Sequence, residues 1–130
     1  MSDVREDALF IVAQEWVGAK CPSLTLNRAS KRIQGKGGPE LALVNLRQGV
    51  FIVQLKIAGE GYTNYHCVAF NAQKGLFVDN NRHVGPLELK DSDRASSENA
   101  RKVLRRTCLY NDTKGYKVFA NNLYELTLTE

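Results

Sequence analysis

The clearest pattern of apolar and polar positions lies in the middle of the chain, where three apolar segments follow one another. These segments, at 49–57, 65–71 and 75–80, are rich in β-branched and aromatic residues, which favour strands. A polar turn, GEGYTN, separates the first two segments. The loop NAQKG, with Gly75 at a position that favours a left-handed conformation, separates the last two. The pattern predicts an antiparallel meander of three strands.

Helical periodicity appears on either side of this meander. Near the N-terminus, apolar residues recur every three or four positions after Ser2 or Asp3, either of which can cap a helix. A second helix is predicted near 97–109, with Ser96 or Ser97 as its N-cap. Its apolar stripe consists of Ala100, Val103, Leu104 and Cys108. Helices packed on antiparallel strands make α+β the predicted fold class.

The remaining segments leave alternatives open. The segment SLTL favours a short strand and NRASKRIQ favours one or two helical turns, whereas ELALVNL fits either a strand or a helix. The C-terminal segment YKVFANNLYELTL predicts either one strand or a hairpin that turns at Asn121–Asn122. A chain of 130 residues has room for one well-packed core, so a single domain spanning 1–130 is expected.

Composition narrows the class of protein. Hydrophobic residues make up 43% of the chain and charged residues 25%, the balance of an ordinary soluble protein. The first residues carry mixed charge without the pattern of a signal peptide, and the longest apolar run, Ala8–Ala13, is too short to span a bilayer. We therefore expect a cytoplasmic or otherwise intracellular protein that does not bind membranes.

The sequence indicates no metal site and no cofactor. Cys21, Cys67 and Cys108 are odd in number and widely spaced, which favours free thiols over a disulfide framework or a zinc site. The segment GKGG lacks the lead-in and the following Ser or Thr of a phosphate-binding P-loop. A formal net charge of +4 permits an anionic partner without requiring one.

The second predicted strand carries a histidine that faces the next strand across a tight hairpin. Strand alternation places the His66 side chain on the same face as Val68 and Phe70. The residue opposite it falls within 79–82, so Asp79, Asn80 or Asn81 lies within cross-strand reach. Such a side chain can accept the imidazole N–H and fix the ring tautomer. A buried hairpin with a hydrogen-bonded structural histidine is the other interpretation.

The segments HCVAF and GLFVDN together resemble the His strand and the Asp/Asn strand of papain-like cysteine peptidases. The resemblance covers residues 49–81. It implies that His66 is a general base, that Asp79 or Asn80 orients it, and that the substrate is a peptide or protein. It also implies an upstream nucleophilic cysteine, for which Cys21 is the only candidate in this chain.

Two further features bear on that cysteine. Gln14 precedes Cys21 by seven residues and corresponds to the glutamine with which such enzymes bind the oxyanion. The residues that follow, Pro22 and SLTL, favour an extended chain where the family has a long helix. A structural thiol is therefore the alternative interpretation of Cys21.

Clusters of basic residues predict a function of a different class. One cluster surrounds the GKGG loop and the other lines the exposed side of the helix near 97–109. The first comprises Arg28, Lys31, Arg32 and Lys36, and the second comprises Arg101, Lys102, Arg105 and Arg106. Within the second cluster no acidic residue interrupts the cations. The alternative function is a non-catalytic interaction module that binds an acidic protein or nucleic acid through this helix face.

Overall fold

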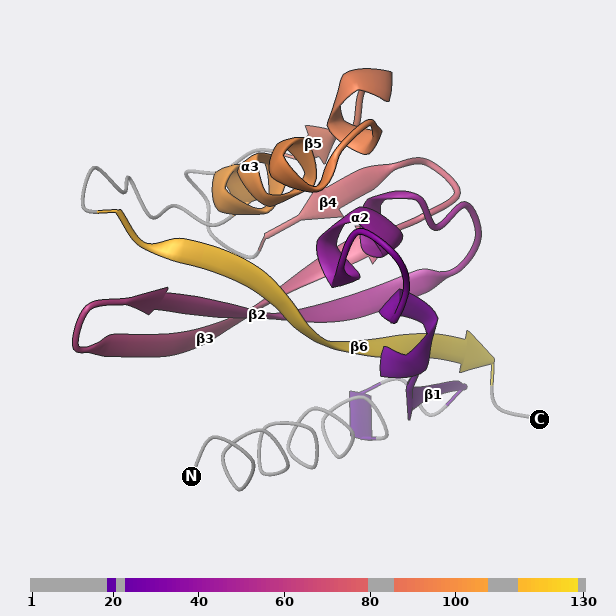
Figure 1. The fold of residues 1–130 in the computed structure, drawn as a ribbon. Coiled ribbons are helices and arrows are strands. Elements are labelled where there is room, and N and C mark those ends of the chain that lie inside the picture. Colours follow the sequence, from indigo (N-terminus) through magenta and orange to yellow (C-terminus); the bar gives the residue numbers. More distant parts are fainter. Residues whose placement is uncertain (1–18, 21–22, 80–85, 108–114, 129–130) are drawn as a thin grey trace.

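A six-stranded antiparallel sheet, in the order β1-β6-β2-β3-β4-β5, organises the protein (Figure 1). The computed structural model describes residues 19–20, 23–79, 86–107 and 115–128. The strands are β1 (Leu24–Arg28), β2 (Val50–Gly59), β3 (Tyr62–Asn71), β4 (Leu76–Val78), β5 (Leu87–Glu88) and β6 (Lys117–Leu128). The described helices are η1 (Ser30–Ile33) and η2 (Asp91–Arg94), both 3-10 helices, and the α-helices α2 (Pro39–Val44) and α3 (Ser97–Thr107). The α+β class predicted from the sequence is confirmed.

The predicted meander is present as β2, β3 and β4. Its first turn is tighter than GEGYTN suggested, because Gly59 pairs with Tyr62 and leaves only two residues between the strands. Both strands are therefore longer than predicted. In the second turn, Gly75 adopts a φ of 63° and donates its backbone N–H to the Ala72 carbonyl at 3.2 Å. This is the left-handed turn position that the loop NAQKG predicted.

The helix predicted near 97–109 is α3, whose N-cap is Ser96. The Ser96 hydroxyl accepts the backbone N–H of Asn99 at 3.1 Å, whereas the Ser97 hydroxyl donates to the Gly37 carbonyl. The buried residues of α3 include Ala100, Val103 and Leu104 of the predicted stripe. Cys108 and the predicted N-terminal helix lie outside the described residues. No described helix has the length and apolar character needed to cross a membrane.

The ambiguous segments take the forms that their local sequence permits. SLTL contributes to β1, NRASKRIQ contains η1, and ELALVNL becomes the short helix α2. Pro39 begins α2, where its missing N–H removes no helical hydrogen bond and its fixed φ suits the first turn.

The hydrophobic core lies on one face of the sheet, under α2 and α3, which Figure 1 shows on the same side. Alternate residues of β2 point into this core, and four of them are fully buried: Phe51, Val53, Leu55 and Ile57. The rings of Phe70 and Phe77 stack with their centroids 4.2 Å apart and join β3 to β4. Opposite them, the helices contribute Leu43, Val44, Ala100, Val103 and Leu104.

Strand β6 is one continuous strand with a β-bulge, so the alternative of a hairpin at Asn121–Asn122 does not occur. Gln54 pairs with Asn122 and Leu55 pairs with Ala120, which leaves Asn121 as the extra residue. Both asparagine side chains donate to the Gln54 side-chain oxygen, Asn121 at 3.0 Å and Asn122 at 2.9 Å. These asparagines therefore fix β6 to the central strand and do not form a turn.

A buried carboxylate holds the same bulge from the core face. Glu40, in the first turn of α2, is 3% exposed and accepts the Ala120 backbone N–H at 3.1 Å. Burial raises the pKa of the Glu40 carboxyl above its usual value of 4.5. Two interactions lower this pKa: the hydrogen bond from the Ala120 N–H, and the positive charge of the Arg101 guanidinium, which lies 3.9 Å from the Glu40 carboxylate.

The raised pKa predicts that Glu40 makes stability depend on pH. The unfolded chain releases this proton near pH 4.5, whereas the folded protein keeps it to a higher pH. The contribution of Glu40 to the free energy of unfolding therefore falls as the pH rises from the unfolded pKa through the folded one. Glu40→Gln keeps an acceptor for Ala120 and removes the titration, so the variant should gain stability relative to the wild type as the pH rises.

Urea denaturation of the wild type and of Glu40→Gln between about pH 4 and pH 8 measures this difference. Glu60→Gln, in the exposed β2–β3 turn, is the matched control. A difference in stability that stays constant with pH, or that changes in the opposite direction, would show that Glu40 does not titrate in this way.

Candidate functional site

The structure brings the side chains of His66 and Asp79 into direct contact. Both carboxylate oxygens of Asp79 lie 3.0 Å from Nε2 of His66. The Asp79 side chain is 1% exposed, whereas that of His66 is 31% exposed. The buried carboxylate of Asp79 thus contacts an imidazole ring, that of His66, which solvent can reach.

The strand register explains why these two side chains meet. His66 pairs with Leu55 and points to the helix-covered face of the sheet, together with Val68. On the neighbouring strand, Phe77 is buried and Val78 points outward, so alternation turns Asp79 inward again. Continuing the β3–β4 register beyond the Ala69–Val78 pair makes Asp79 the diagonal neighbour of His66.

This contact fixes the role of each ring nitrogen. An ionised carboxylate only accepts hydrogen bonds, so Nε2 must carry the hydrogen that Asp79 accepts. In a neutral ring the lone pair then lies on Nδ1. No hydrogen bond joins Nδ1 to another described residue. The ring can therefore accept a proton at Nδ1 while Asp79 stabilises the imidazolium that results.

Of the three cysteines, Cys67 is the one that the structure describes. Cys67 pairs with Gln54 across β2 and β3, so its side chain points to the face opposite His66. The residue is exposed, yet desolvation by neighbouring atoms raises the pKa of its thiol above the usual 9.0. Both facts argue against Cys67 as a nucleophile. The other predicted catalytic residues, Gln14, Cys21 and Asn80, lie outside the described residues.

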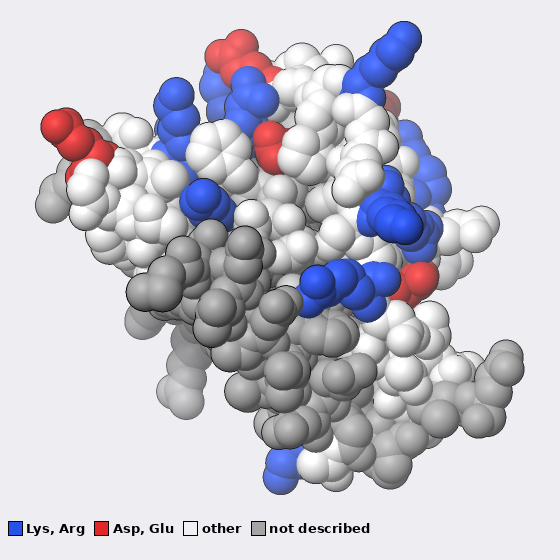
Figure 2. Space-filling view, turned by 60° about the horizontal axis from the view of Figure 1, so that its bottom comes forward, with Lys and Arg blue, Asp and Glu red and all other residues white. Residues whose placement is uncertain are grey.

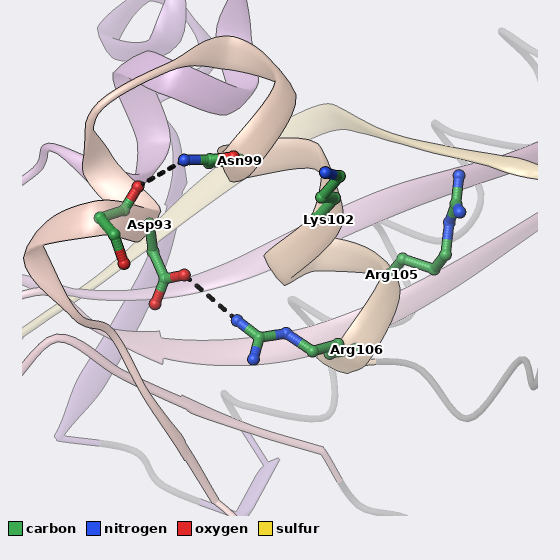
Figure 3. A pocket seen from close by; sticks show the side chains of 6 residues that line it. Asp93, Asn99, Lys102, Arg105 and Arg106 are labelled. Atoms are coloured by element: carbon green, nitrogen blue, oxygen red, sulfur yellow. Dashed lines mark hydrogen bonds and ion pairs between the residues drawn. The ribbon is translucent and has the colours of Figure 1, made fainter.

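The cations of α3 do not form one unpaired surface. Arg101 lies 3.9 Å from the buried Glu40, Lys102 lies 3.5 Å from Glu98, and Arg106 lies 3.2 Å from Asp93. In Figure 3, Arg106 points toward Asp93, whereas Arg105 points away from it. The run of cations in the sequence is thus partly neutralised, because most of its acidic partners come from other elements.

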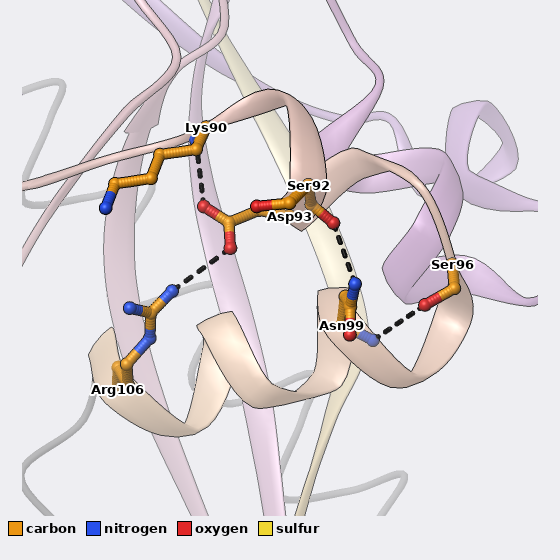
Figure 4. A network of polar contacts seen from close by, with 6 residues as sticks. All are labelled: Lys90, Ser92, Asp93, Ser96, Asn99 and Arg106. Carbon is orange, nitrogen blue, oxygen red and sulfur yellow. Dashed lines mark hydrogen bonds and ion pairs between the residues drawn. The ribbon is translucent and has the colours of Figure 1, made fainter.

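A network of hydrogen bonds joins η2 to α3 (Figure 4). Asp93 accepts the Lys90 backbone N–H at 2.8 Å as well as the guanidinium of Arg106. The Asn99 side chain donates to the Ser92 carbonyl at 2.9 Å. Beside this network lies an open pocket of about 490 Å³, lined by Ser92, Asp93, Asn99, Lys102, Arg105 and Arg106.

The first basic cluster predicted from the sequence also borders a pocket. Arg28, Lys31 and Arg32 line it together with Ala29, Ser30, Gln34 and Glu125, and its volume is about 550 Å³. Lys36 is not part of this lining. Figure 2 shows Lys and Arg side chains spread over one face of the molecule, with acidic side chains beside some of them.

Comparison with known proteins identifies no relative. The chain matches no protein-family model, no curated protein and no solved structure. Within the described ranges, no three His, Cys, Asp or Glu side chains gather in a way that could hold a metal ion. Its function therefore has to be inferred from the geometry of its side chains.

The His66–Asp79 contact predicts an energetic coupling that can be measured. His66→Ala leaves the buried Asp79 carboxylate without this partner and should lower the free energy of unfolding by about 1–3 kcal/mol. In a double-mutant cycle with Asp79→Asn, the double variant should lose less stability than the sum of the two single losses, by about 1 kcal/mol. Urea denaturation at neutral pH measures all four proteins.

The exposed pair Glu98 and Lys102, four residues apart on α3, provides the control cycle. Its coupling should not exceed about 0.5 kcal/mol, because solvent screens exposed ion pairs. Strict additivity of His66→Ala and Asp79→Asn would contradict a direct interaction between the two side chains.

Proposed function

We propose that this protein is a thiol hydrolase that resembles papain-like cysteine peptidases, with His66 as the general base and Asp79 as its orienting partner. The observation that supports this proposal is the contact of a buried carboxylate with one nitrogen of a solvent-accessible imidazole. Such a pair is suited to move a proton reversibly at the other nitrogen.

In the proposed reaction, Cys21 supplies the nucleophile. Its thiol proton moves to Nδ1 of His66, and the sulfur attacks the carbonyl carbon of a peptide or protein substrate. The imidazolium then returns the proton to the departing amine, which leaves a thioester on Cys21. Water hydrolyses this thioester, again with His66 as the base. Gln14 is the proposed donor to the oxyanion, and Asn80 is a second candidate to orient the histidine.

A role for Asp79 in orientation follows from its burial. A carboxylate with 1% exposure cannot reach a substrate in solvent, so it acts through the ring that it holds. His66, with 31% exposure, is the member of the pair that a thiol or a substrate can approach. Asp79 is therefore a positioning residue, and His66 is the catalytic one.

The proposal predicts the relative reactivity of the three cysteines. Under brief treatment with iodoacetamide, Cys21 should be alkylated fastest, because a neighbouring base raises its thiolate fraction. His66→Ala should slow the labelling of Cys21 by about tenfold or more, and Asp79→Ala should slow it to a smaller extent. Peptide mapping by mass spectrometry assigns the label to each cysteine.

Two controls make this labelling experiment specific. Cys67 lies on the opposite face of the sheet from His66, so its labelling rate should not change in either variant. His83→Ala removes the other histidine of the chain and should leave Cys21 reactive. Equal and slow labelling of all three cysteines would leave the proposed enzyme without a nucleophile.

A second candidate function is binding of an anionic partner through α3. The observation that favours it is the open pocket beside Lys102, Arg105 and Arg106 (Figure 3). The partner would be an acidic protein segment or nucleic acid. Arg101 is less suited to this role than the sequence suggested, because it faces the buried carboxylate of Glu40.

This second candidate predicts binding that depends on charge and on salt. Lys102→Glu combined with Arg105→Glu should weaken binding of polyglutamate or of a single-stranded oligonucleotide by about tenfold or more. Fluorescence anisotropy at low and high salt measures this effect. Lys74→Glu combined with Lys117→Glu gives the same change of net charge at two exposed lysines outside α3. Equal losses in both double variants would remove α3 as the docking surface.

A further inference from the structure

The face of the sheet that points away from α2 and α3, here called the outer face, carries an apolar cluster of its own. Leu26 of β1 and Tyr124 of β6 form its centre, with exposures of 1% and 2%, and Leu24, Ile52 and Leu126 pack against them. Cross-strand pairing of Leu26 with Leu126 and of Ile52 with Tyr124 places these side chains on one face. This outer cluster spans β1, β6 and β2, which are neighbours in the sheet (Figure 1).

The outer cluster is buried although the described helices that pack on the sheet lie on its opposite face. The described members of the cluster all belong to strands, whereas η1, α2 and α3 contribute Ile33, Leu43 and Val103 to the core under the helices. Gln54 also points to the outer face, because its neighbours along β2 point into the core, and it is 0% exposed. A sheet face without a covering layer is in contact with water. Another part of the protein must therefore cover these side chains.

The pattern of exposure shows which side of the outer face is covered. Cys67 of β3 and Val78 of β4 point to this face and are exposed. Leu26, Tyr124 and Gln54, on β1, β6 and β2, are buried. The cover therefore lies over the side of the sheet where β1 is the edge strand.

The segment 1–18 enters the fold on that side. Only residues 19–23 separate it from Leu24, the first residue of β1. By contrast, residues 80–85 follow β4 on the other side of the sheet, and residues 108–114 follow α3 on the opposite face. Of these segments, 1–18 is thus the one whose attachment point is closest to the outer cluster.

The sequence of this segment suits a position on the outer cluster. Apolar side chains recur at helical spacing along it, namely those of Val4, Ala8, Ile11, Val12 and Trp16. A helix of 18 residues is about 27 Å long. Neighbouring strands lie about 4.8 Å apart, so a helix of this length reaches across β1, β6 and β2. Contact between the two apolar surfaces would remove both from water.

We propose that residues 3–17 form an amphipathic helix whose apolar stripe packs on the outer cluster, so that helices cover the sheet on both faces. The side chains of the outer cluster are already buried in a single copy of the chain. The occupant is therefore a segment of this chain and not a second copy. This docking site does not involve His66 or the cations of α3.

Trp16, the only tryptophan of the chain, lies in the proposed stripe and reports on the docking. In the folded protein its fluorescence emission should lie at a shorter wavelength than in the urea-unfolded chain, and acrylamide should quench it weakly. Ile52→Lys introduces a charge into the outer cluster. This variant should shift the emission to a longer wavelength and increase the quenching, while circular dichroism establishes that it is folded.

Val78→Lys is the matched control. Val78 is 42% exposed on the outer face and lies on β4, outside the cluster, so this variant adds the same charge and should leave the emission of Trp16 unchanged. A second measurement needs no variant. In the wild type, nuclear Overhauser effects should join side chains of residues 4–16 to the methyl groups of Leu24, Ile52 or Leu126.

Four results would each overturn the proposal. The first is an emission of Trp16 that is the same in the folded and unfolded wild type, and the second is an equal shift in the two lysine variants. The third is the absence of any nuclear Overhauser effect between the segment and the outer cluster. The fourth is a short-wavelength emission found only at concentrations at which light scattering detects a dimer, which would assign the outer face to a second copy.

Discussion

Strand β2 is paired on both sides, and the other elements take their positions from it. All ten of its residues pair with β3, and all but its last residue pair with β6. Its inward side chains form the base of the core under α2 and α3. Where β6 departs from regular pairing, Gln54 binds the bulge from one face and Glu40 binds it from the other. The bulge is thus specified by two buried polar side chains, which need these hydrogen bonds because water cannot reach them.

The same pairing determines the candidate site. Because Leu55 pairs with His66, the histidine must point to the core face at the edge of the helix-covered region. A buried carboxylate needs a hydrogen-bond donor, and Asp79 has the imidazole at 3.0 Å. The hydrogen bond to Nε2 of His66 compensates for the burial of the Asp79 carboxylate. The same hydrogen bond leaves Nδ1 of His66 as the nitrogen available for proton transfer. The burial of Asp79 and the proposed chemistry therefore depend on the same contact.

The sequence predicts correctly those elements whose residues interact with neighbours close by in the chain. The meander follows from β-branched residues and turn glycines. Strand alternation alone places Asp79, Asn80 or Asn81 within reach of His66, and the structure shows that Asp79 makes the contact. The bulge could not be predicted, since it depends on Glu40, which lies 80 residues from Ala120 in the chain. The pairing of Arg101 and Arg106 was missed for the same reason, because their carboxylates belong to α2 and η2. Contacts between distant segments leave no periodic signal in the sequence.

The position of the hydrogen on the His66 ring shows whether Asp79 prepares this histidine to accept a proton at Nδ1. Nitrogen-15 NMR of the imidazole, in solution alkaline enough to keep the ring neutral, distinguishes the two ring nitrogens. We expect a hydrogen on Nε2, where Asp79 accepts it, and an unprotonated Nδ1. A hydrogen on Nδ1, or rapid averaging between the two tautomers as in free imidazole, would contradict it.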